Sequence, residues 1–121
     1  MPKSANTHAV LRKSRCVLDC AGKLTALESD VEEDCIYGLL WRVGEADVMA
    51  LNQYERVSQY QHRIEYVDVE SYWGNVNAFT YRSMLDTKTS RFDYEYMSRI
   101  VQASRGLCFP QNYIIGLRTL R

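Results

Sequence analysis

Glu55 is the residue in this sequence best suited to acid–base chemistry. It follows directly on a helix predicted for residues 45–54, so its carboxylate lies at the negative end of the helix dipole, where the ionised form is disfavoured. Burial beside Tyr54, Tyr60 and Trp41 would act in the same direction. A carboxyl group whose pKa is raised toward neutrality can take up and release a proton near pH 7. These features make Glu55 a candidate general acid/base.

A structural role for Glu55 is the alternative. Most glutamates are solvated, and Arg56 and Arg63 lie close by in the sequence, where either could form a surface ion pair with this carboxylate. Position alone favours this surface role over the catalytic one.

The other reactive side chains predict no second catalytic centre. The sequence contains no phosphate-binding loop, dinucleotide-binding loop, zinc-protease motif or serine-nucleophile motif. Its two histidines, His8 and His62, are too few for a multi-histidine metal site, and His62 on a strand is better explained by packing or surface exposure than by catalysis. We therefore expect neither a metal nor a cofactor.

The cysteines indicate free thiols rather than a framework of disulfides or metal ligands. Four cysteines occur, without the paired spacing of a zinc site. Cys35 and Cys108 are expected in the core, whereas Cys16 and Cys20 are compatible with exposure. Since the first 30 residues contain no apolar leader segment and no run approaches 18 apolar residues, we expect a cytoplasmic, reducing location and no membrane span.

The overall charge gives no electrostatic reason to bind nucleic acid or an acidic membrane surface. The 121 residues include 15 basic and 15 acidic side chains, and the formal net charge is zero. Nine tyrosines could form a stacking platform for RNA bases, but no basic cluster accompanies them. Tyr81, Tyr94, Tyr96 and Tyr113 are better explained as residues of the core or of a pocket wall.

The pattern of apolar residues predicts the elements that position Glu55. A nearly continuous apolar strand buried on both faces is expected at 35–43, with Gly38 marking close packing or a bulge. The helix at 45–54 should turn Val48, Leu51 and Tyr54 inward. The remaining elements are a strand at 23–27, an antiparallel hairpin with strands at 60–70 and 76–82, a helix from about 92 ending at a left-handed Gly106, and a short helix opening at Pro110 with Tyr113, Ile114 and Leu117 inward.

These elements predict one α+β domain over residues 1–121, built as a small curved mixed sheet or barrel with short helices packed against it. Residues 1–10 are expected to be poorly ordered, with at most a short strand at 9–12.

The order of several short motifs matches a known family. They are YGLLWRV at 37–43, LNQYERV at 51–57, VNAFTYR at 76–82 and YMSRIVQASRGLCFPQNY at 96–113, preceded by a similar segment at 11–30. Each motif is degenerate, but their order and spacing resemble the γ-glutamylcyclotransferase-like (AIG2-like) family over about residues 11–117.

The resemblance implies both a fold and a reaction. The fold is a small barrel-like α+β domain. In the reaction, the α-amine of a γ-glutamyl group attacks its own γ-carbonyl and releases 5-oxoproline and an amine or amino acid. The family's acid/base falls on Glu55. Substrate-lining positions fall on Tyr96 and, with an ambiguous alignment, on Tyr60 or His62. The implied partner is a small γ-glutamyl substrate, with no cofactor.

One departure from the family pattern leaves an alternative open. The family begins with a strand and a Tyr-Gly-Ser-Asn-type loop whose backbone N–H groups hold the γ-glutamyl moiety, and this motif is absent from the sequence. A missing oxyanion donor lowers rates about a hundredfold or more. We therefore expect either an enzyme that obtains this loop otherwise, or a truncated, non-catalytic interaction or dimerisation module whose open sheet edge favours a homodimer.

Overall fold

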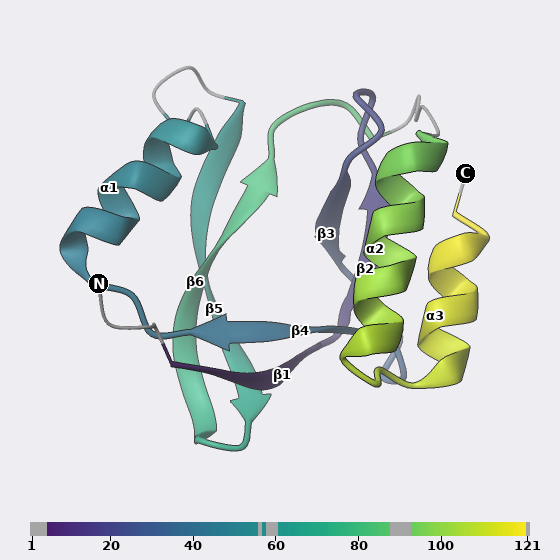
Figure 1. The fold of residues 1–121 in the computed structure, drawn as a ribbon, viewed down its shortest axis with the longest axis horizontal. Helices are drawn as coiled ribbons and strands as arrows, with labels where there is room; N and C mark the ends of the chain where they lie inside the picture. Colours follow the sequence, from purple (N-terminus) through teal and green to yellow (C-terminus); the bar gives the residue numbers. More distant parts are fainter. Residues whose placement is uncertain (1–4, 56, 58–60, 88–92, 121) are drawn as a thin grey trace.

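The computed structural model describes residues 5–55, 57, 61–87 and 93–120. Within these residues the chain forms strands and helices in the mixed order expected of an α+β domain (Figure 1). The strands are β1 (Asn6–Arg12), β2 (Ser14–Leu18), β3 (Leu24–Glu28), β4 (Cys35–Trp41), β5 (His62–Ser71) and β6 (Gly74–Ser83); the helices are α1 (Glu45–Tyr54), α2 (Tyr94–Gly106) and α3 (Gln111–Arg118).

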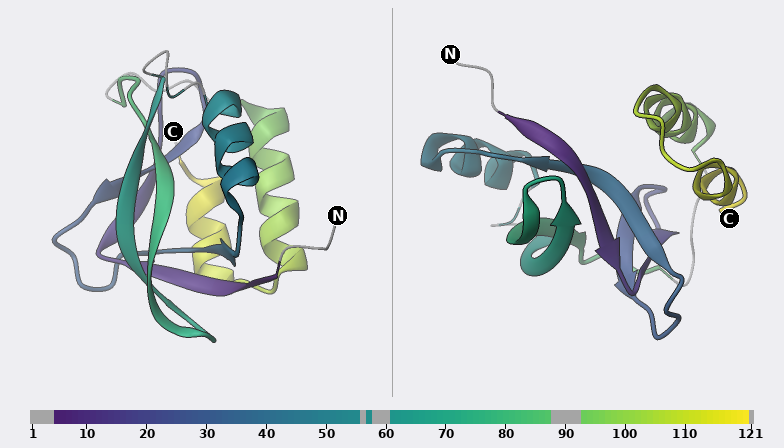
Figure 2. Two further views of the ribbon diagram at one scale, coloured as in Figure 1. Left: turned by 90° about the vertical axis from the view of Figure 1, so that its left-hand side faces the viewer. Right: turned by 90° about the horizontal axis from the view of Figure 1, so that it is seen from below.

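The main sheet is antiparallel and curled, with strand order β4-β1-β5-β6. Strands β1 and β4 pair along their whole length, from Asn6 opposite Trp41 to Arg12 opposite Cys35. In contrast, β1 meets β5 only through Ala9 opposite Ser71 and the adjacent pair. The sheet therefore bends sharply between β1 and β5, and the β5–β6 hairpin rises across β1 and β4 (Figure 2). The expected curved sheet is confirmed.

The β5–β6 hairpin turns where the sequence predicted it. Gly74 adopts a φ of 97°, a conformation open to glycine because it has no Cβ. The Ser71 hydroxyl donates to the Gly74 carbonyl at 2.8 Å and accepts from the Trp73 N–H at 3.1 Å. These bonds close the turn and set the register of the hairpin.

The apolar core lies between the β2–β3 hairpin and the two C-terminal helices. Leu18 of β2 packs with Met97, Val101, Ile114 and Leu117, all of which are buried. Helices α2 and α3 lie side by side in every view (Figures 1 and 2). The expected inward face of α3 is confirmed, with Ile114 and Leu117 buried and Tyr113 half-buried.

The ends of α2 differ from the prediction. The helix begins at Tyr94 behind Asp93, whose side chain caps it by accepting from the Tyr96 N–H at 3.1 Å. The expected start near residue 92 lies outside the described residues. The predicted left-handed Gly106 is wrong, because Cys108 takes that conformation with a φ of 58°. Helix α2 thus ends at Gly106, two residues before the left-handed Cys108.

Helix α1 begins and ends as predicted but faces the sheet differently. None of its residues is fully buried, and the expected inward Tyr54 is 81% exposed. Successive residues turn by about 100° around a helix, which places Glu55 on the same side as the half-buried Val48 and Asn52, and Tyr54 away from it. The inward stripe is therefore rotated by one residue and includes Glu55.

Three expectations about the strands are wrong. β1 begins at Asn6, earlier than expected, because its pairing with β4 orders the segment. β4 is only half-buried, since it has a neighbour on one side alone among the described residues. Gly38 marks neither close packing nor a bulge: it pairs regularly with Ala9, and a Cβ there would meet no atom within 4 Å.

The cysteines form no disulfide, and they fall into an exposed pair and a half-buried pair. Cys20 and Cys108 are exposed, whereas Cys16 and Cys35 are half-buried, so the expected core position of Cys108 is wrong and that of Cys35 is only partly met. The Cys16 thiol lies 3.5 Å from the Tyr113 hydroxyl, and burial is the main cause that raises the pKa of Cys16.

The thiols should therefore differ in reactivity. With iodoacetamide at pH 8 we expect Cys20 and Cys108 to be alkylated first and Cys16 last, because only the thiolate reacts and a raised pKa lowers its population. Mass spectrometry of peptides from a time course measures the order. Modification of Cys16 as early as Cys20 would contradict this placement.

Candidate functional site

Glu55 lies at the C-terminal end of α1 with its side chain largely enclosed. Its backbone is still helical (φ −79°, ψ −1°), and its N–H donates to the Leu51 carbonyl at 2.8 Å. This last helical bond holds Glu55 on the inward side of α1. The side chain is 24% exposed, so the carboxylate is neither freely solvated nor fully buried. Of the aromatic residues expected to enclose it, Trp41 is 51% exposed and Tyr54 is 81% exposed, and Tyr60 lies outside the described residues.

His62 contacts Glu55 at two points. It is the first residue of β5, and its side chain is 23% exposed. The Nδ1 atom lies 3.0 Å from the Glu55 backbone carbonyl and 3.4 Å from carboxylate Oε2. Because a carbonyl oxygen only accepts hydrogen bonds, this arrangement assigns the proton to Nδ1. His62 thereby joins the end of α1 to the start of β5 and orients the carboxylate.

Arg63 does not form the surface ion pair with Glu55 that was the structural alternative. The Arg63 guanidinium lies 3.5 Å from Glu65 instead. This follows from strand geometry, because neighbouring residues of β5 point to opposite faces, so Arg63 lies on the same face as Glu65 and His62 on the other. Arg56 lies outside the described residues.

Two tyrosines from other elements come within electrostatic range of Glu55. Burial raises the pKa of Tyr81, and the Glu55 charge raises it further. The Tyr81 hydroxyl donates to Asn52 Oδ1 at 2.6 Å, one turn before Glu55 on α1. For Tyr96, burial is again the main cause of a raised pKa, with Glu55 among the weaker contributors. Both hydroxyls therefore stay protonated at neutral pH and can donate hydrogen bonds.

The sequence identified part of this group. It named Glu55, His62 and Tyr96, and the structure places the first two in contact and the third within electrostatic range. Tyr81 was expected only as a core or pocket residue, and Asn52 was missed. The available signal for Asn52 was its spacing of three residues from Glu55, which puts both on one side of a helix.

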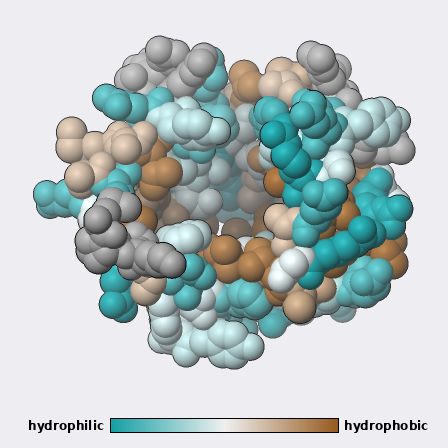
Figure 3. Space-filling model, in the orientation of Figure 1, coloured by the Kyte–Doolittle hydropathy of each residue, from teal (hydrophilic) through white to brown (hydrophobic). Residues whose placement is uncertain are grey.

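The Glu55 end of α1 borders open space. Figure 3 shows the molecule hollowed at its centre, between the side that carries α1 and the side that carries α2. A cavity of about 700 Å³ lies along β4, β6 and α1, and Tyr81 lines it. Leu51 also lines the cavity, whereas Glu55, His62 and Tyr96 do not. A carboxylate and a histidine about one helical turn from such a cavity are suited to exchange protons with a molecule that extends beyond it.

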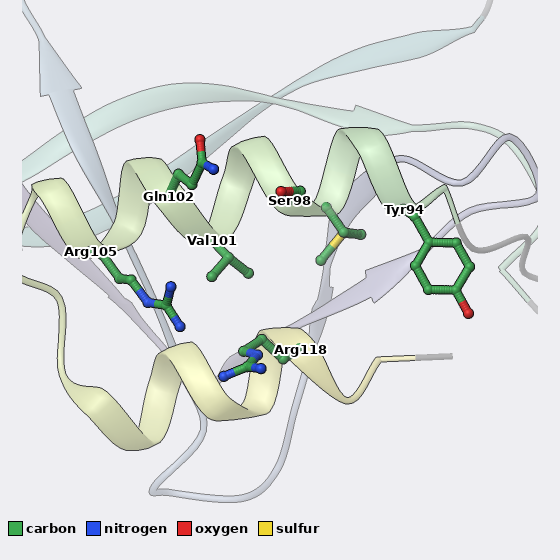
Figure 4. A pocket seen from close by; sticks show the side chains of 7 residues that line it. Tyr94, Ser98, Val101, Gln102, Arg105 and Arg118 are labelled. Carbon is green, nitrogen blue, oxygen red and sulfur yellow. The ribbon is translucent and has the colours of Figure 1, made fainter.

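A separate pocket of about 370 Å³ lies between α2 and α3 (Figure 4). Arg105 and Arg118 extend into it from the two helices. Neither Glu55 nor His62 lines this pocket, so it is distinct from the candidate site.

No group of three or more histidine, cysteine or acidic side chains in the described part of the chain could hold a metal ion. Among the same residues, no helix is both long enough and apolar enough to cross a membrane.

Solved structures share this fold at low sequence identity. A γ-glutamyl cyclotransferase superposes with a TM-score of 0.82 and 17% identity, over 99% of this chain and 76% of that one. An uncharacterized protein from Homo sapiens gives a TM-score of 0.81 at 18% identity, covering 99% and 76% of the two chains. YkqA from Bacillus subtilis gives 0.76 at 19%, covering 93% of this chain and 42% of its own. These likenesses confirm the expected fold.

Sequence comparison identifies the family directly. No curated protein sequence matches the chain significantly. The AIG2-like family, however, matches residues 35–117, which run from β4 through α3 and include Glu55, His62, Tyr81 and Tyr96. The match spans more than half of the chain, and the chain therefore belongs to the AIG2-like family.

Proposed function

We propose that this protein is a γ-glutamylcyclotransferase with Glu55 as its general acid/base. The observation that carries the proposal is the partly enclosed Glu55 carboxylate, held by His62, on the last turn of a helix whose Leu51 lines a cavity. The substrate is a γ-glutamyl amino acid or related conjugate. Family membership and the likeness in fold to a γ-glutamyl cyclotransferase support this substrate class.

The reaction needs one proton acceptor that later becomes a donor. The α-amine of the γ-glutamyl group must lose a proton before it can attack the γ-carbonyl, and the leaving nitrogen must gain one. Glu55 accepts the first proton and returns it to the leaving amine, so the site ends in its starting state. The products are 5-oxoproline and a free amine or amino acid, and no water is consumed.

The surrounding groups position the substrate and its developing charge. Ring closure is intramolecular, so holding the γ-glutamyl chain folded supplies much of the rate enhancement. The Tyr96 hydroxyl accepts from the Leu24 N–H at 3.1 Å and keeps its own proton, so it is suited to donate to the oxyanion that forms on the γ-carbonyl, whereas the Tyr81 proton is used on Asn52. His62 keeps the carboxylate aimed into the site through its contact at 3.4 Å. The four free cysteines are consistent with a reducing, cytoplasmic setting.

The test is to incubate the purified protein with γ-glutamyl-alanine and to measure 5-oxoproline and alanine. The proposal predicts that both appear in equal amounts. Product below the uncatalysed background would contradict it. A protein that binds the substrate by calorimetry without releasing product would instead be a non-catalytic member of the family.

A further inference from the structure

The cavity beside the candidate site is a groove between the two outer strands of the sheet. Its walls include the consecutive residues 39–43 at the end of β4 and 76–81 of β6, with Leu51 from α1. Successive strand residues point to opposite faces, so consecutive residues line a groove only where it runs along the strand edge. The groove is thus open along both strands and is large enough, at about 700 Å³, for a drug-sized molecule.

The wall of the groove is aromatic. Trp41, Tyr66, Trp73 and Phe79 all line it, and the two tryptophans are the only ones in the sequence. Trp41 is 51% exposed and Trp73 is 42% exposed, although large aromatic side chains gain most when they are covered. This surface is suited to a flat or bulky apolar group.

Arg42 gives the groove its charge. It lines the cavity with its guanidinium over the Trp73 ring, 5.3 Å from the ring centre. None of the described lining residues is acidic, and among the described residues Arg42 makes no ion pair. A carboxylate is the natural complement of a guanidinium held in this way.

The groove ends at Leu51 and Tyr81, close to the candidate catalytic group. Leu51 lines it and lies one helical turn before Glu55, whose N–H bonds to the Leu51 carbonyl. Tyr81 also lines it and is held by Asn52 on the same side of α1. A molecule in the groove therefore has one end about one helical turn from Glu55, which does not itself line the groove, and the other beside Arg42 and the tryptophans.

We infer that this groove binds the leaving portion of the substrate, and that this portion is a bulky apolar or aromatic amino acid whose α-carboxylate pairs with Arg42. The inference rests on the proposed function and specifies its substrate class. A γ-glutamyl-phenylalanine would place its γ-glutamyl group at Glu55 and its phenyl ring among the aromatic residues. The C–N bond to phenylalanine breaks as the ring of 5-oxoproline closes, and the α-amine proton moves through Glu55 to the departing nitrogen.

The experiment measures binding by tryptophan fluorescence, because both tryptophans lie in the groove. The Glu55→Gln protein is used so that the ligand is not consumed. It is titrated with γ-glutamyl-phenylalanine, γ-glutamyl-glycine and γ-glutamyl-phenethylamine, the last of which has the aromatic ring without the carboxylate. We expect the phenylalanine conjugate to bind about 30-fold more tightly than the glycine conjugate, from burial of the phenyl group.

A charge variant separates the carboxylate contact from the aromatic one. Arg42→Gln should weaken binding of γ-glutamyl-phenylalanine about tenfold and leave γ-glutamyl-phenethylamine unchanged. Arg99→Gln is the matched control, since Arg99 is exposed on α2 and pairs with Glu95. It should change neither affinity. Equal affinity for the phenylalanine and glycine conjugates, equal effects of Arg42→Gln on both aromatic ligands, or no fluorescence change with any ligand would overturn the assignment.

Turnover by the wild-type protein distinguishes failure of this inference from failure of the proposed function. Selective binding without 5-oxoproline from any conjugate would reject the cyclotransferase and leave the groove as a ligand site. Release of 5-oxoproline with equal kcat/KM for the phenylalanine and glycine conjugates would retain the enzyme and reject the groove assignment.

Discussion

Glu55→Gln should lower kcat/KM for γ-glutamyl-alanine by about 100- to 10,000-fold, the usual contribution of a positioned acid/base. Glutamine keeps the size of the side chain, and its carbonyl can still accept from His62 Nδ1, which lies 3.4 Å from the present carboxylate. It cannot carry a proton between the attacking and leaving nitrogens. The loss should therefore appear in the chemical step while the fold is retained.

The control for this substitution is Glu45→Gln at the other end of α1. Glu45 is exposed in the first turn of the helix, where its charge favours the helix dipole slightly. We expect this variant to keep wild-type turnover, and both variants to melt within a few degrees of the wild type. Similar activity in the two variants would remove Glu55 from the mechanism.

Asp19→Ala should lower the free energy of unfolding by about 3 kcal/mol, because it removes three hydrogen bonds to a buried carboxylate. Asp19 is 1% exposed. One carboxylate oxygen accepts from the N–H groups of Ala21 and Lys23 at 2.9 and 3.0 Å, and the other accepts from the Ser83 hydroxyl at 2.7 Å. This side chain thus joins the β2–β3 turn to the end of β6.

Urea denaturation followed by circular dichroism measures this effect. Ser83→Ala removes one of the three Asp19 bonds and also the bond that the Leu85 N–H donates to the Ser83 hydroxyl at 3.1 Å, and it should lower the free energy of unfolding by about 1.5 kcal/mol. Asp30→Ala, at an exposed position, serves as the control and should change it by less than about 0.5 kcal/mol. An Asp19→Ala protein as stable as the Asp30→Ala protein would show that this hydrogen-bonded cluster contributes little.

Local sequence signals predicted most of the secondary structure. The helix at 45–54 was predictable because Gly44 precedes it and acidic residues occupy its first turn. The β5–β6 hairpin was predictable because its turn needs a positive φ at position 74, which glycine adopts readily. These signals act over a few residues, so they do not depend on how the elements pack.

The errors arose where burial depends on distant elements. The apolar run of β4 indicated a strand covered on both faces, but one edge of β4 faces the groove instead. The inward stripe of α1 was placed one residue away, because Tyr54 was assumed to be buried for its apolar ring. The correct stripe includes polar Asn52 and Glu55, which a pattern of apolar residues cannot identify.

The candidate site was predictable only in part, because the contacts of Glu55 depend on how distant elements pack. Glu55 was identified from its place at the end of a helix, together with the family motif. Of the two arginines that charge favoured as partners, Arg56 lies outside the described residues and Arg63 is turned toward Glu65, while the neighbouring His62 contacts Glu55. Tyr81 joins the site through the fold of the hairpin, which brings β6 against the last turn of α1.

Chemical rescue of the Glu55→Ala protein is the sharpest test of a carboxylate that carries the proton. The alanine side chain leaves room for a small acid beside His62, and formate added to the solution can take the place of the missing group. The account predicts that 5-oxoproline release from γ-glutamyl-alanine is nearly abolished without formate and rises in proportion to formate concentration, whereas chloride at equal ionic strength has no effect. Wild-type turnover by Glu55→Ala in the absence of formate would contradict it.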